Sequence, residues 1–492
     1  MPKQDDIEQM LRIGKDTLFY GGTNVMARAV SLALLPFYTR FFVPAEYGVM
    51  ELLMTVSAIV PRLLSVGMDS ALLRFYNDYD VDERRESAFT VAVYFACIGI
   101  PVALLLSTFS EQWSGLLFGS HKYSSLVVIM LLAVPFTMIG WVPQDLTRLR
   151  FKKLEYNFLM VGGALFYAVA AVILVLFFQQ GLYGVMWGHL LRAVLFAFLG
   201  IILVRSSFTV RLDWKKLAEF VKFGAPLLPA SIALWVSNSS DRFFLARLAS
   251  LDSVGVYSVA TRLASVQWFV LTSFQLAFTP IAYAVYREPS AESLFRRVFM
   301  YYVTLSSILG IVLSVFALNL LRILTPQSYH SGYNVVGLLN LGVIMHGVFY
   351  MFGIGLSIAK RTEYFAYSYV LGALANLALN LLLIPRFGVV GAATATLVSF
   401  ALTAVCGFYW SKVSYPLHFP ISRLVVLCGL FLISYLLAVF IDSSLGGNIL
   451  LKSCIAGIYV ALTLLLLHGE ERILLVDMAR GIIKRGWVIW KS

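Results

Sequence analysis

The sequence predicts an all-α polytopic membrane protein with about fourteen transmembrane helices, arranged as two six-helix lobes and an additional helix pair. Hydrophobic residues make up 60% of the 492 residues and charged residues 13%, and the mean hydropathy is +0.83. A soluble domain is roughly half apolar and a quarter charged. The strands of a membrane barrel alternate in hydrophobicity, and runs such as 161–178 do not, so the spans are helices.

Fourteen apolar runs are long enough to cross a bilayer, which takes about 20 mostly apolar residues in a helix. Residues 1–16 precede them and are polar and mixed in charge, so we expect no cleavable signal and an insertion directed by the first span. In chain order the predicted spans are 17–42, 46–75, 88–109, 123–147, 156–178, 181–204, 218–247, 253–284, 294–319, 331–358, 364–385, 387–411, 421–441 and 449–467.

Short sequence matches at nearly one offset indicate an internal repeat. "KKLEY" at Lys152 is matched by "KRTEY" 208 residues later, and "GLYGV" at Gly181 by "GVVGA" 207 residues later. "YGV" at Tyr47 is matched by "VGV" 207 residues later, and "TRFF" at Thr39 by "DRFF" 202 residues later. Spans 1–6 and 7–12 are therefore two copies, and because each has an even number of spans, both enter the membrane from the same side.

This repeat sets the predicted domain boundaries. Residues 1–210 form the N-terminal six-helix lobe, 211–415 the C-terminal six-helix lobe and 416–470 the extra helix pair. Residues 471–492 mix tryptophan and isoleucine with lysine and arginine, which fits a cytoplasmic tail or a helix on the inner membrane surface.

The positions of the 38 lysines and arginines predict the orientation. With both termini in the cytoplasm, 27 of them fall on the inner side, 7 on the outer side and 4 inside spans, as the positive-inside rule requires. The formal net charge of +12 is thus spread over many short loops. That distribution argues against nucleic acid as a partner, because no single basic face is formed.

The loops and motifs argue against several enzyme classes. The sequence contains no phosphate-binding G-x-x-x-x-G-K-[ST] motif, no H-E-x-x-H motif, and no serine or cysteine with an evident histidine partner. The four cysteines lie in apolar runs without metal-ligand spacing. We therefore expect neither an enzyme, a metal nor a cofactor. An ion gradient, the membrane potential or removal of the substrate would have to drive any transport.

Polar residues recur on one face of several spans, at helical steps of three and four. An arginine at the bilayer centre costs about 2.5–3.5 kcal/mol, so the arginines among them should face a cavity or partners. Two of these stripes come from each copy, and they can meet between the lobes. They comprise Thr17, Gly21, Asn24, Arg28 and Ser31; Glu51, Thr55, Ala58, Arg62, Ser65 and Asp69; Ser231, Trp235, Asn238 and Arg242; and Ser258, Arg262 and Ser265.

Several arginines and few acids in one cavity favour an anion, because guanidinium forms forked hydrogen bonds with phosphate. We expect Arg28, Arg62 and Arg262 to hold it. The other predicted lining residues are Asn24, Asn238, Asp241 and Arg242. The alternative is that these side chains only join helices by hydrogen bonds, and Asp241 could simply pair with Arg242 or another arginine.

Three further charged residues allow more than one interpretation. Carboxylates inside spans often mark ion paths, so Glu51 and Asp69 are candidates for coupling to a proton or sodium gradient, with a salt bridge to an arginine as the alternative for Asp69. Arg192 follows Gly181, Gly184 and Gly188 on nearly the same helix face, which favours tight helix packing, with a place in the lining of the cavity as the alternative.

Four stretches of the sequence resemble the bacterial polysaccharide transporters, or O-antigen flippases, of the multidrug/oligosaccharidyl-lipid/polysaccharide exporter superfamily. They are "GGTNVMARAVSLALLPFYTRFFVPAEYGVMELL", "DRFFLARLASLDSVGVYSVATRL", "KRTEY" and "FGVVGAATAT". The resemblance implies a V-shaped protein of the bacterial cytoplasmic membrane that moves undecaprenyl-diphosphate-linked oligosaccharides to the outer leaflet by alternating access. It implies lipid-linked oligosaccharide, membrane lipids and other polysaccharide-assembly proteins as partners. The related lipid II flippases carry cavity arginines in spans 1, 2 and 8, the spans that hold Arg28, Arg62 and Arg262 here.

Two other functions remain open on the sequence. A cation-coupled multidrug antiporter of the same superfamily would need acids to dominate the cavity, and Glu51 and Asp69 keep this alternative open. A membrane polysaccharide polymerase or ligase would be expected to carry a sizeable outer loop, and no loop here is that long.

Overall fold

The computed structural model describes residues 19, 21–23, 25–444 and 446–467, and all regular elements in these ranges are helices. The first helix is described at residues 19, 21–23 and 25–33. It is followed by α2 (Leu35–Phe41), α3 (Pro44–Ser65), α4 (Met68–Phe75), α5 (Val81–Thr108), α6 (Ser110–Phe118), η1 (His121–Tyr123), α7 (Ser124–Leu149), α8 (Lys153–Asn157), the π-helical turn η2 (Phe158–Gly162), α9 (Gly163–Leu176), α10 (Leu182–Leu203) and η3 (Arg205–Ser207).

The second half continues the all-helical pattern. It contains α11 (Trp214–Gly224), η4 (Ala225–Leu227), α12 (Leu228–Leu248), α13 (Leu251–Ala264), α14 (Val266–Val285), α15 (Ala291–Val315), α16 (Ala317–Leu324), η5 (Gln327–Gly332), α17 (Tyr333–Ile358) and α18 (Glu363–Ser414). A last pair, α19 (Ile421–Ser444) and α20 (Ile449–Leu465), ends the described chain.

The helices account for each of the fourteen predicted spans. Among the described residues, 11 helices are long and apolar enough to cross a membrane. One of these, the 52-residue α18, bends at Gly388 and holds two spans. The predicted first span corresponds to the first helix and α2, the eighth to α13 and α14 in succession, and the last to the short apolar helix α20. The predicted fold class is confirmed.

Two glycines show the internal repeat in the backbone itself. Gly181 has φ 53° and ψ −129°, and its counterpart in the second copy, Gly388, has φ 52° and ψ −126°. Side chains other than glycine rarely adopt this conformation. In both copies it joins the fifth span to the sixth, so the same turn is built twice.

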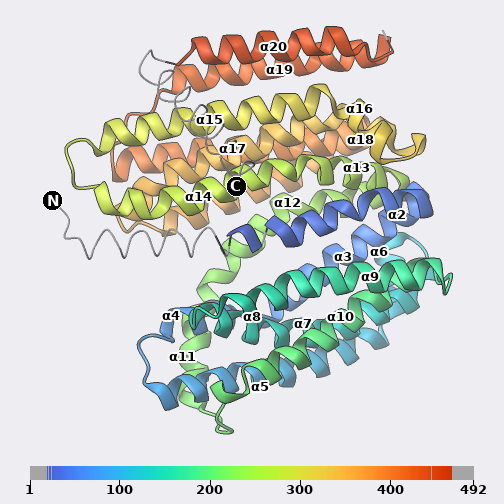
Figure 1. Cartoon of the computed structure of the whole chain (residues 1–492), viewed down its shortest axis with the longest axis vertical. Helices are drawn as coiled ribbons and strands as arrows, with labels where there is room; N and C mark the ends of the chain where they lie inside the picture. Colours follow the sequence, from blue (N-terminus) through green and yellow to red (C-terminus); the bar gives the residue numbers. More distant parts are fainter. Residues whose placement is uncertain (1–18, 20, 24, 445, 468–492) are drawn as a thin grey trace, which may run out of the picture.

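The helices form two bundles that lie one above the other in Figure 1, with their axes roughly parallel. The first helix and α2–α10 make the first bundle and α12–α18 the second, while α19 and α20 pack along the far side of α15. Helix α11, which begins the segment 211–415 predicted as the C-terminal lobe, packs against α4 and α5 of the first bundle. Its buried Lys216 donates a hydrogen bond of 3.2 Å to Glu86 on α5.

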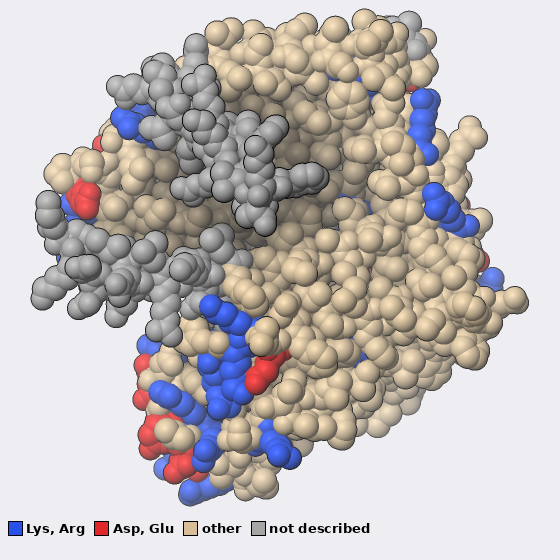
Figure 2. Space-filling model, viewed as in Figure 1, with Lys and Arg blue, Asp and Glu red and all other residues tan. Residues whose placement is uncertain are grey.

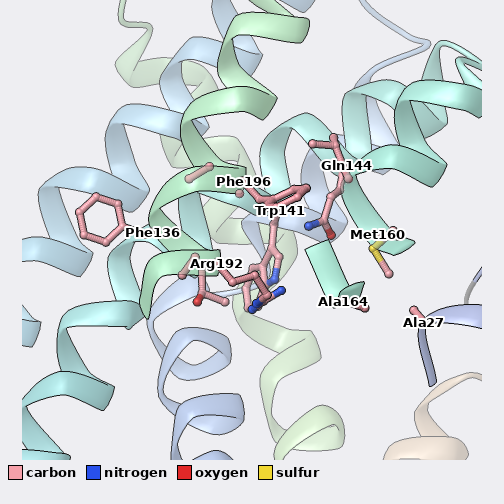
Figure 3. A pocket seen from close by; sticks show the side chains of 13 residues that line it. Ala27, Phe136, Trp141, Gln144, Met160, Ala164, Arg192 and Phe196 are labelled. Carbon is pink, nitrogen blue, oxygen red and sulfur yellow. The ribbon is translucent and has the colours of Figure 1, made fainter. Parts of the chain in front are cut away.

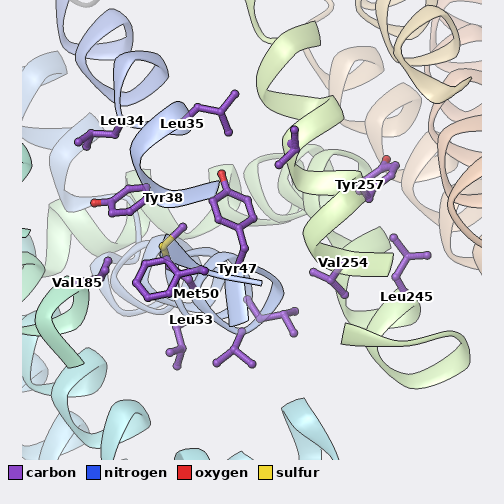
Figure 4. Close-up of a cluster of buried hydrophobic side chains, with 14 of the residues drawn as sticks. Leu34, Leu35, Tyr38, Tyr47, Met50, Leu53, Val185, Leu245, Val254 and Tyr257 are labelled. Atoms are coloured by element: carbon purple, nitrogen blue, oxygen red, sulfur yellow. The ribbon is translucent and has the colours of Figure 1, made fainter. Parts of the chain in front are cut away.

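The hydrophobic cores show where the bundles touch. One core contains residues from both bundles, and Figure 4 shows Tyr38, Tyr47 and Val185 of the first bundle in the same cluster as Val254 and Tyr257 of the second. The other two large cores each belong to one bundle and its neighbouring elements. We call the end where α3 and α13 begin the closed end, because among the described residues one hydrophobic core joins the two bundles there.

Two glycines allow the contact at the closed end. A Cβ atom on Gly48 of α3 would lie 2.2 Å from the Leu251 carbonyl oxygen, and a Cβ on Gly255 of α13 would lie 2.0 Å from the Pro44 carbonyl oxygen. Tyr329 in η5 adds a hydrogen bond of 2.6 Å to the Phe42 carbonyl oxygen. Backbones of the two bundles are thus in direct contact.

The opposite end of the first bundle carries most of its charge. Figure 2 shows blue and red side chains gathered at the lower left, over α4, α8, α11 and the start of α5. Asp80 begins α5 there as a capping box, accepting a hydrogen bond of 2.8 Å from the Glu83 backbone N–H. We call this the charged end.

Candidate anion-binding cavity

A cavity of about 470 Å³ lies between the two bundles. Its walls come from the first helix, α3, α12, α13 and α14, so both copies of the repeat contribute. The lining residues are Arg28, Ser31, Leu32, Glu51, Leu234, Asn238, Arg242, Thr261, Arg262, Ser265 and Trp268. Among the described lining residues, three guanidinium groups thus face one carboxylate, an excess of positive charge.

An ion pair across the bundles forms one wall of this cavity. The Nη2 atom of Arg262 on α13 lies 2.8 Å from Oε1 of Glu51 on α3. The Nη1 atom of the same guanidinium donates a hydrogen bond to Ser31 of the first helix. Glu51 is buried, whereas the Arg262 side chain is 31% exposed, so the guanidinium holds the first bundle and still reaches the cavity.

Arg28 is the least constrained of the three arginines. It is exposed, and within the described residues it forms no ion pair. It lines both the central cavity and a neighbouring one of about 290 Å³ between the first helix and α14. Arg28 therefore stands where the two spaces meet.

The polar stretch 237–242 of α12 faces two different environments. Asn238 and Arg242 are one helical turn apart, line the cavity and are joined by a hydrogen bond of 3.3 Å from Arg242 Nη1 to the Asn238 carbonyl oxygen. Ser237, Ser240 and Asp241 instead point into the second bundle and are buried. Because a helix turns by about 100° per residue, consecutive polar residues cannot all line one cavity.

Asp241 belongs to a polar core between α12 and α18. Its carboxylate accepts hydrogen bonds from the Tyr257 hydroxyl and, at 3.4 Å, from Thr396 Oγ1, and it lies 3.7 Å from Arg242. Nearby, Ser240 donates to Asn376 at 2.8 Å, and Asn380 donates to Asn376 at 3.0 Å. The expected pairing of Asp241 with Arg242 is present, but the carboxylate lies behind the cavity wall.

Three other predicted residues lie away from the central cavity or outside the described chain. Arg62 is exposed near the end of α3, with its guanidinium carbon 5.8 Å from the ring centroid of Trp141 on α7. Asp69 lies in the first turn of α4 and, in the described part of the chain, forms no ion pair with an arginine. Asn24 falls outside the residues that the structure describes, as does the predicted tail 471–492.

Several residues that matter to this site lie outside the predicted stripes. Thr261 lies next to Arg262 and also lines the cavity. Asn376 and Asn380 complete the polar core behind it. The signal for these two was available, since they are polar residues one turn apart in an apolar run.

Comparisons with known proteins place the chain in a family. A family model described as "Polysaccharide biosynthesis protein" matches residues 37–290, more than half of the chain. The chain belongs to this family. The matched region includes four of the helices that line the cavity, α3, α12, α13 and α14. This member of the family has 11 helices of membrane-spanning length and composition among its described residues, and three arginines line its central cavity.

Similarity to individual proteins is low in sequence and high in fold. The chain is 24% identical over 255 residues to the succinoglycan biosynthesis transport protein ExoT of Rhizobium meliloti. That alignment covers 50% of this chain and 49% of ExoT, so it spans about half the length of this relative.

Two solved structures share the fold. Lipid II flippase MurJ in an inward closed conformation superposes with a TM-score of 0.75 at 15% identity, covering 91% of this chain and 97% of MurJ. An inward-facing multidrug resistance MATE family transporter of the MOP superfamily gives 0.59 at 14% identity, covering 81% and 94%. The fold of this family member is that of MOP-superfamily transporters.

Proposed function

We propose that the protein is a flippase that moves an undecaprenyl-diphosphate-linked oligosaccharide, such as an O-antigen or exopolysaccharide repeat unit, across the cytoplasmic membrane. The observation that carries this proposal is the cavity between the bundles, where Arg28, Arg242 and Arg262 face the single carboxylate of Glu51. A diphosphate brings negative charge into the membrane and loses its hydration there. Guanidinium groups already in place can offset that loss.

Alternating access supplies the movement in this proposal. The bundles are joined at the closed end by a shared core and by the crossing of α3 and α13. If both termini are cytoplasmic, as the charge bias predicts, the closed end is the outer one and the charged end faces the cytoplasm. The diphosphate would then enter from the inner leaflet and leave after the closed end has opened.

The Glu51–Arg262 pair suits a site that must release its ligand. An incoming diphosphate competes with Glu51 for the Arg262 guanidinium, which lies 2.8 Å from the carboxylate. Binding of the diphosphate therefore breaks the ion pair between the bundles, and its release restores the pair. This exchange keeps the affinity moderate and weakens one contact between the bundles while the substrate is present.

A cation-coupled multidrug antiporter is the second candidate, supported by the shared MATE fold. The charge of the cavity favours the flippase, because in the described part of its lining the one carboxylate, Glu51, is already paired with an arginine. A polymerase or ligase is less favoured still, since the shared fold is that of transporters. Whatever the substrate, we propose that an ion gradient, the membrane potential or substrate removal drives the cycle.

The test is translocation of lipid-linked oligosaccharide in a strain lacking its own transporter, complemented with this chain and normalised to protein level. Each Arg→Ala change at positions 28, 242 and 262 should lower the rate roughly 10- to 150-fold, if each removes one charge-assisted hydrogen bond worth about 1.5–3 kcal/mol. Arg→Lys changes keep the charge but lose the fork and should impair less.

The matched control is Arg247→Ala, which removes an exposed arginine that lies on α12, like Arg242, but does not line the cavity. It should leave translocation unchanged. Full activity of the triple alanine variant at normal abundance would contradict the anion-site proposal. Export of cationic drugs without any effect on lipid-linked sugar would favour the antiporter.

A further inference from the structure

We propose that a second pocket, inside the first bundle and apart from the central cavity, binds a carboxylate or phosphate group carried on a sugar-sized unit. It encloses about 230 Å³ and is lined by α7, η2, α9 and α10, with Ala27 of the first helix at one edge. Its polar lining side chains are Arg192, Gln144 and Thr137, together with the indole N–H of Trp141. This inference rests on the proposed function only in taking the natural ligand to be part of a glycan.

Arg192 is the group that an anion would meet. It lines the pocket, and in the described part of the chain it forms neither an ion pair nor a hydrogen bond. Figure 3 shows its side chain converging with that of Trp141 at the centre of the pocket. A guanidinium inside a span is costly unless it is solvated or paired, so an anion bound in this pocket would supply the partner that Arg192 lacks among the described residues.

The rest of the lining fits a sugar better than a bare ion. Phe136, Trp141 and Phe196 supply flat apolar faces, and Gln144 and Thr137 supply hydrogen-bonding groups beside them. Walls of hydrophobic and aromatic side chains with a few placed polar groups are the usual pattern of small-molecule sites. The volume is below the roughly 300–1,000 Å³ of sites for drug-sized ligands, so the pocket admits one small unit and not an oligosaccharide.

Small residues and a helix irregularity create this space. Gly140, Ala164, Ala193 and Ala197 line the pocket with little side-chain volume. On the facing side the chain makes a π-helical turn at Phe158–Gly162, and Leu159 and Met160 of that turn line the pocket. Such π-turns are rare and occur often at functional sites.

The repeat shows that the architecture does not require an arginine here. When Gly181 and Gly388 are taken as equivalent positions, the counterpart of Arg192 in the second bundle is Ser399. Ser399 is buried and donates a hydrogen bond of 2.8 Å to the Gly372 carbonyl oxygen. The same helix position is therefore packed in one bundle and left open with a cation in the other.

The pocket is separate from the central cavity, and the first helix lies between them. Ala27 borders the pocket, whereas the adjacent Arg28 lines the two spaces next to the second bundle. Arg62 approaches the Trp141 ring, so a second cation stands near the pocket without lining it. A ligand in this pocket can thus be distinguished experimentally from one bound by Arg28 and Arg262.

The test uses the full chain in nanodiscs of neutral phosphatidylcholine and saturation-transfer NMR with four probes: glucuronate, glucose 1-phosphate, glucose and inorganic phosphate. We expect signals from the two charged sugars, a weaker signal from phosphate and none from glucose. Arg192→Gln should abolish the charged-sugar signals, and Ala164→Leu should do so by filling the pocket while keeping the arginine. Arg192→Lys should retain part of the signal.

The control is the double variant Arg28→Gln/Arg262→Gln, which changes the central cavity and the space beside it but no residue of this pocket, and which should keep the signals. Thermal unfolding and elution profiles establish that each variant is folded. If Arg192→Gln does not fold, the signals of Ala164→Leu alone test the proposal. Signals that survive both pocket variants, or that vanish in the central-cavity double variant, would overturn the proposal. Nanodiscs with phosphatidylglycerol separate the two sources: competition by this lipid would identify a headgroup site and refute a glycan ligand.

This outcome is distinguishable from failure of the proposed function. Loss of lipid-linked sugar translocation is measured with variants at positions 28, 242 and 262, none of which lines the pocket. Sugar binding at Arg192 without flippase activity would contradict the flippase proposal and leave the pocket proposal standing. Flippase activity without sugar binding would remove only this inference.

Discussion

A single methyl group at the α3–α13 crossing should shift the protein away from the state closed at that end. In Gly255→Ala the new Cβ would lie 2.0 Å from the Pro44 carbonyl oxygen, far inside the 3.4 Å at which ordinary contacts begin. The atom in the way is backbone and cannot rotate aside, so the two helices must separate.

The size of the shift follows from the cost of overpacking, typically about 1–3 kcal/mol. This cost applies only to the state in which the helices touch, so the ratio of closed to open molecules should fall roughly 5- to 150-fold. Gly48→Ala, whose Cβ would lie 2.2 Å from the Leu251 carbonyl oxygen, should act in the same direction.

The assay is a distance distribution between nitroxides at Gln180 of the first bundle and Ile323 of the second, both exposed residues, in a background lacking the four native cysteines. The distribution should lengthen or broaden in Gly255→Ala, and translocation should slow. Gly457→Ala on α20 is the matched control, because nothing lies within 4 Å of its added Cβ. An unchanged distribution together with full translocation in Gly255→Ala would refute this reasoning.

Three further predictions concern topology, coupling and Arg192. Single cysteines at the exposed Lys122 and Lys215 should react with impermeant reagents from opposite sides of the membrane, and labelling of both from outside would contradict the orientation. Glu51→Gln removes the ion pair with Arg262 and should lengthen the distance between the nitroxides at positions 180 and 323. If Glu51 or Asp69 couples transport to an ion, the dependence of transport on that ion should disappear in Glu51→Gln or in Asp69→Asn. An unaltered ion dependence in both variants would contradict the coupling hypothesis. Arg192→Ala should leave the folded amount near normal if Arg192 serves a pocket, whereas a marked loss of folded protein would support the packing role inferred from the neighbouring glycines.

The composition and the repeat determined the architecture. Apolar runs of bilayer length can satisfy their backbone only as helices, so the count of spans and the all-α class followed directly from the chain. The offset between the copies also located Gly181 and Gly388. Their backbone angles match because a glycine occupies the equivalent turn in each copy. Family-level resemblance was likewise readable, since it depends on segments and not on contacts.

The stripes on single helices identified most of the cavity but not its limits. Arg28, Asn238, Arg242, Arg262 and Glu51 all line it, because helical periodicity reports which residues share a face. Periodicity cannot report which neighbour that face meets. Arg62 shares a stripe with Glu51 but lies nearer the other end of α3, so only Glu51 reaches the second bundle while Arg62 stands near Trp141.

Tertiary structure alone decided which side chains pair and which of them reach a cavity. That Glu51 pairs with Arg262 depends on two helices from different copies of the repeat meeting at the closed end. That Asp241 lies behind the cavity wall depends on the rotation of α12 against α18. The sequence pattern placed Arg192 on a helix-packing face. The structure shows that small residues on the facing helices leave a pocket there, which Arg192 lines. The sequence by itself determined which segments enter the membrane and how charged each helix face is, because these depend on local composition. The pairing of those faces was decided by the fold, because it is set by contacts between segments that no local pattern records.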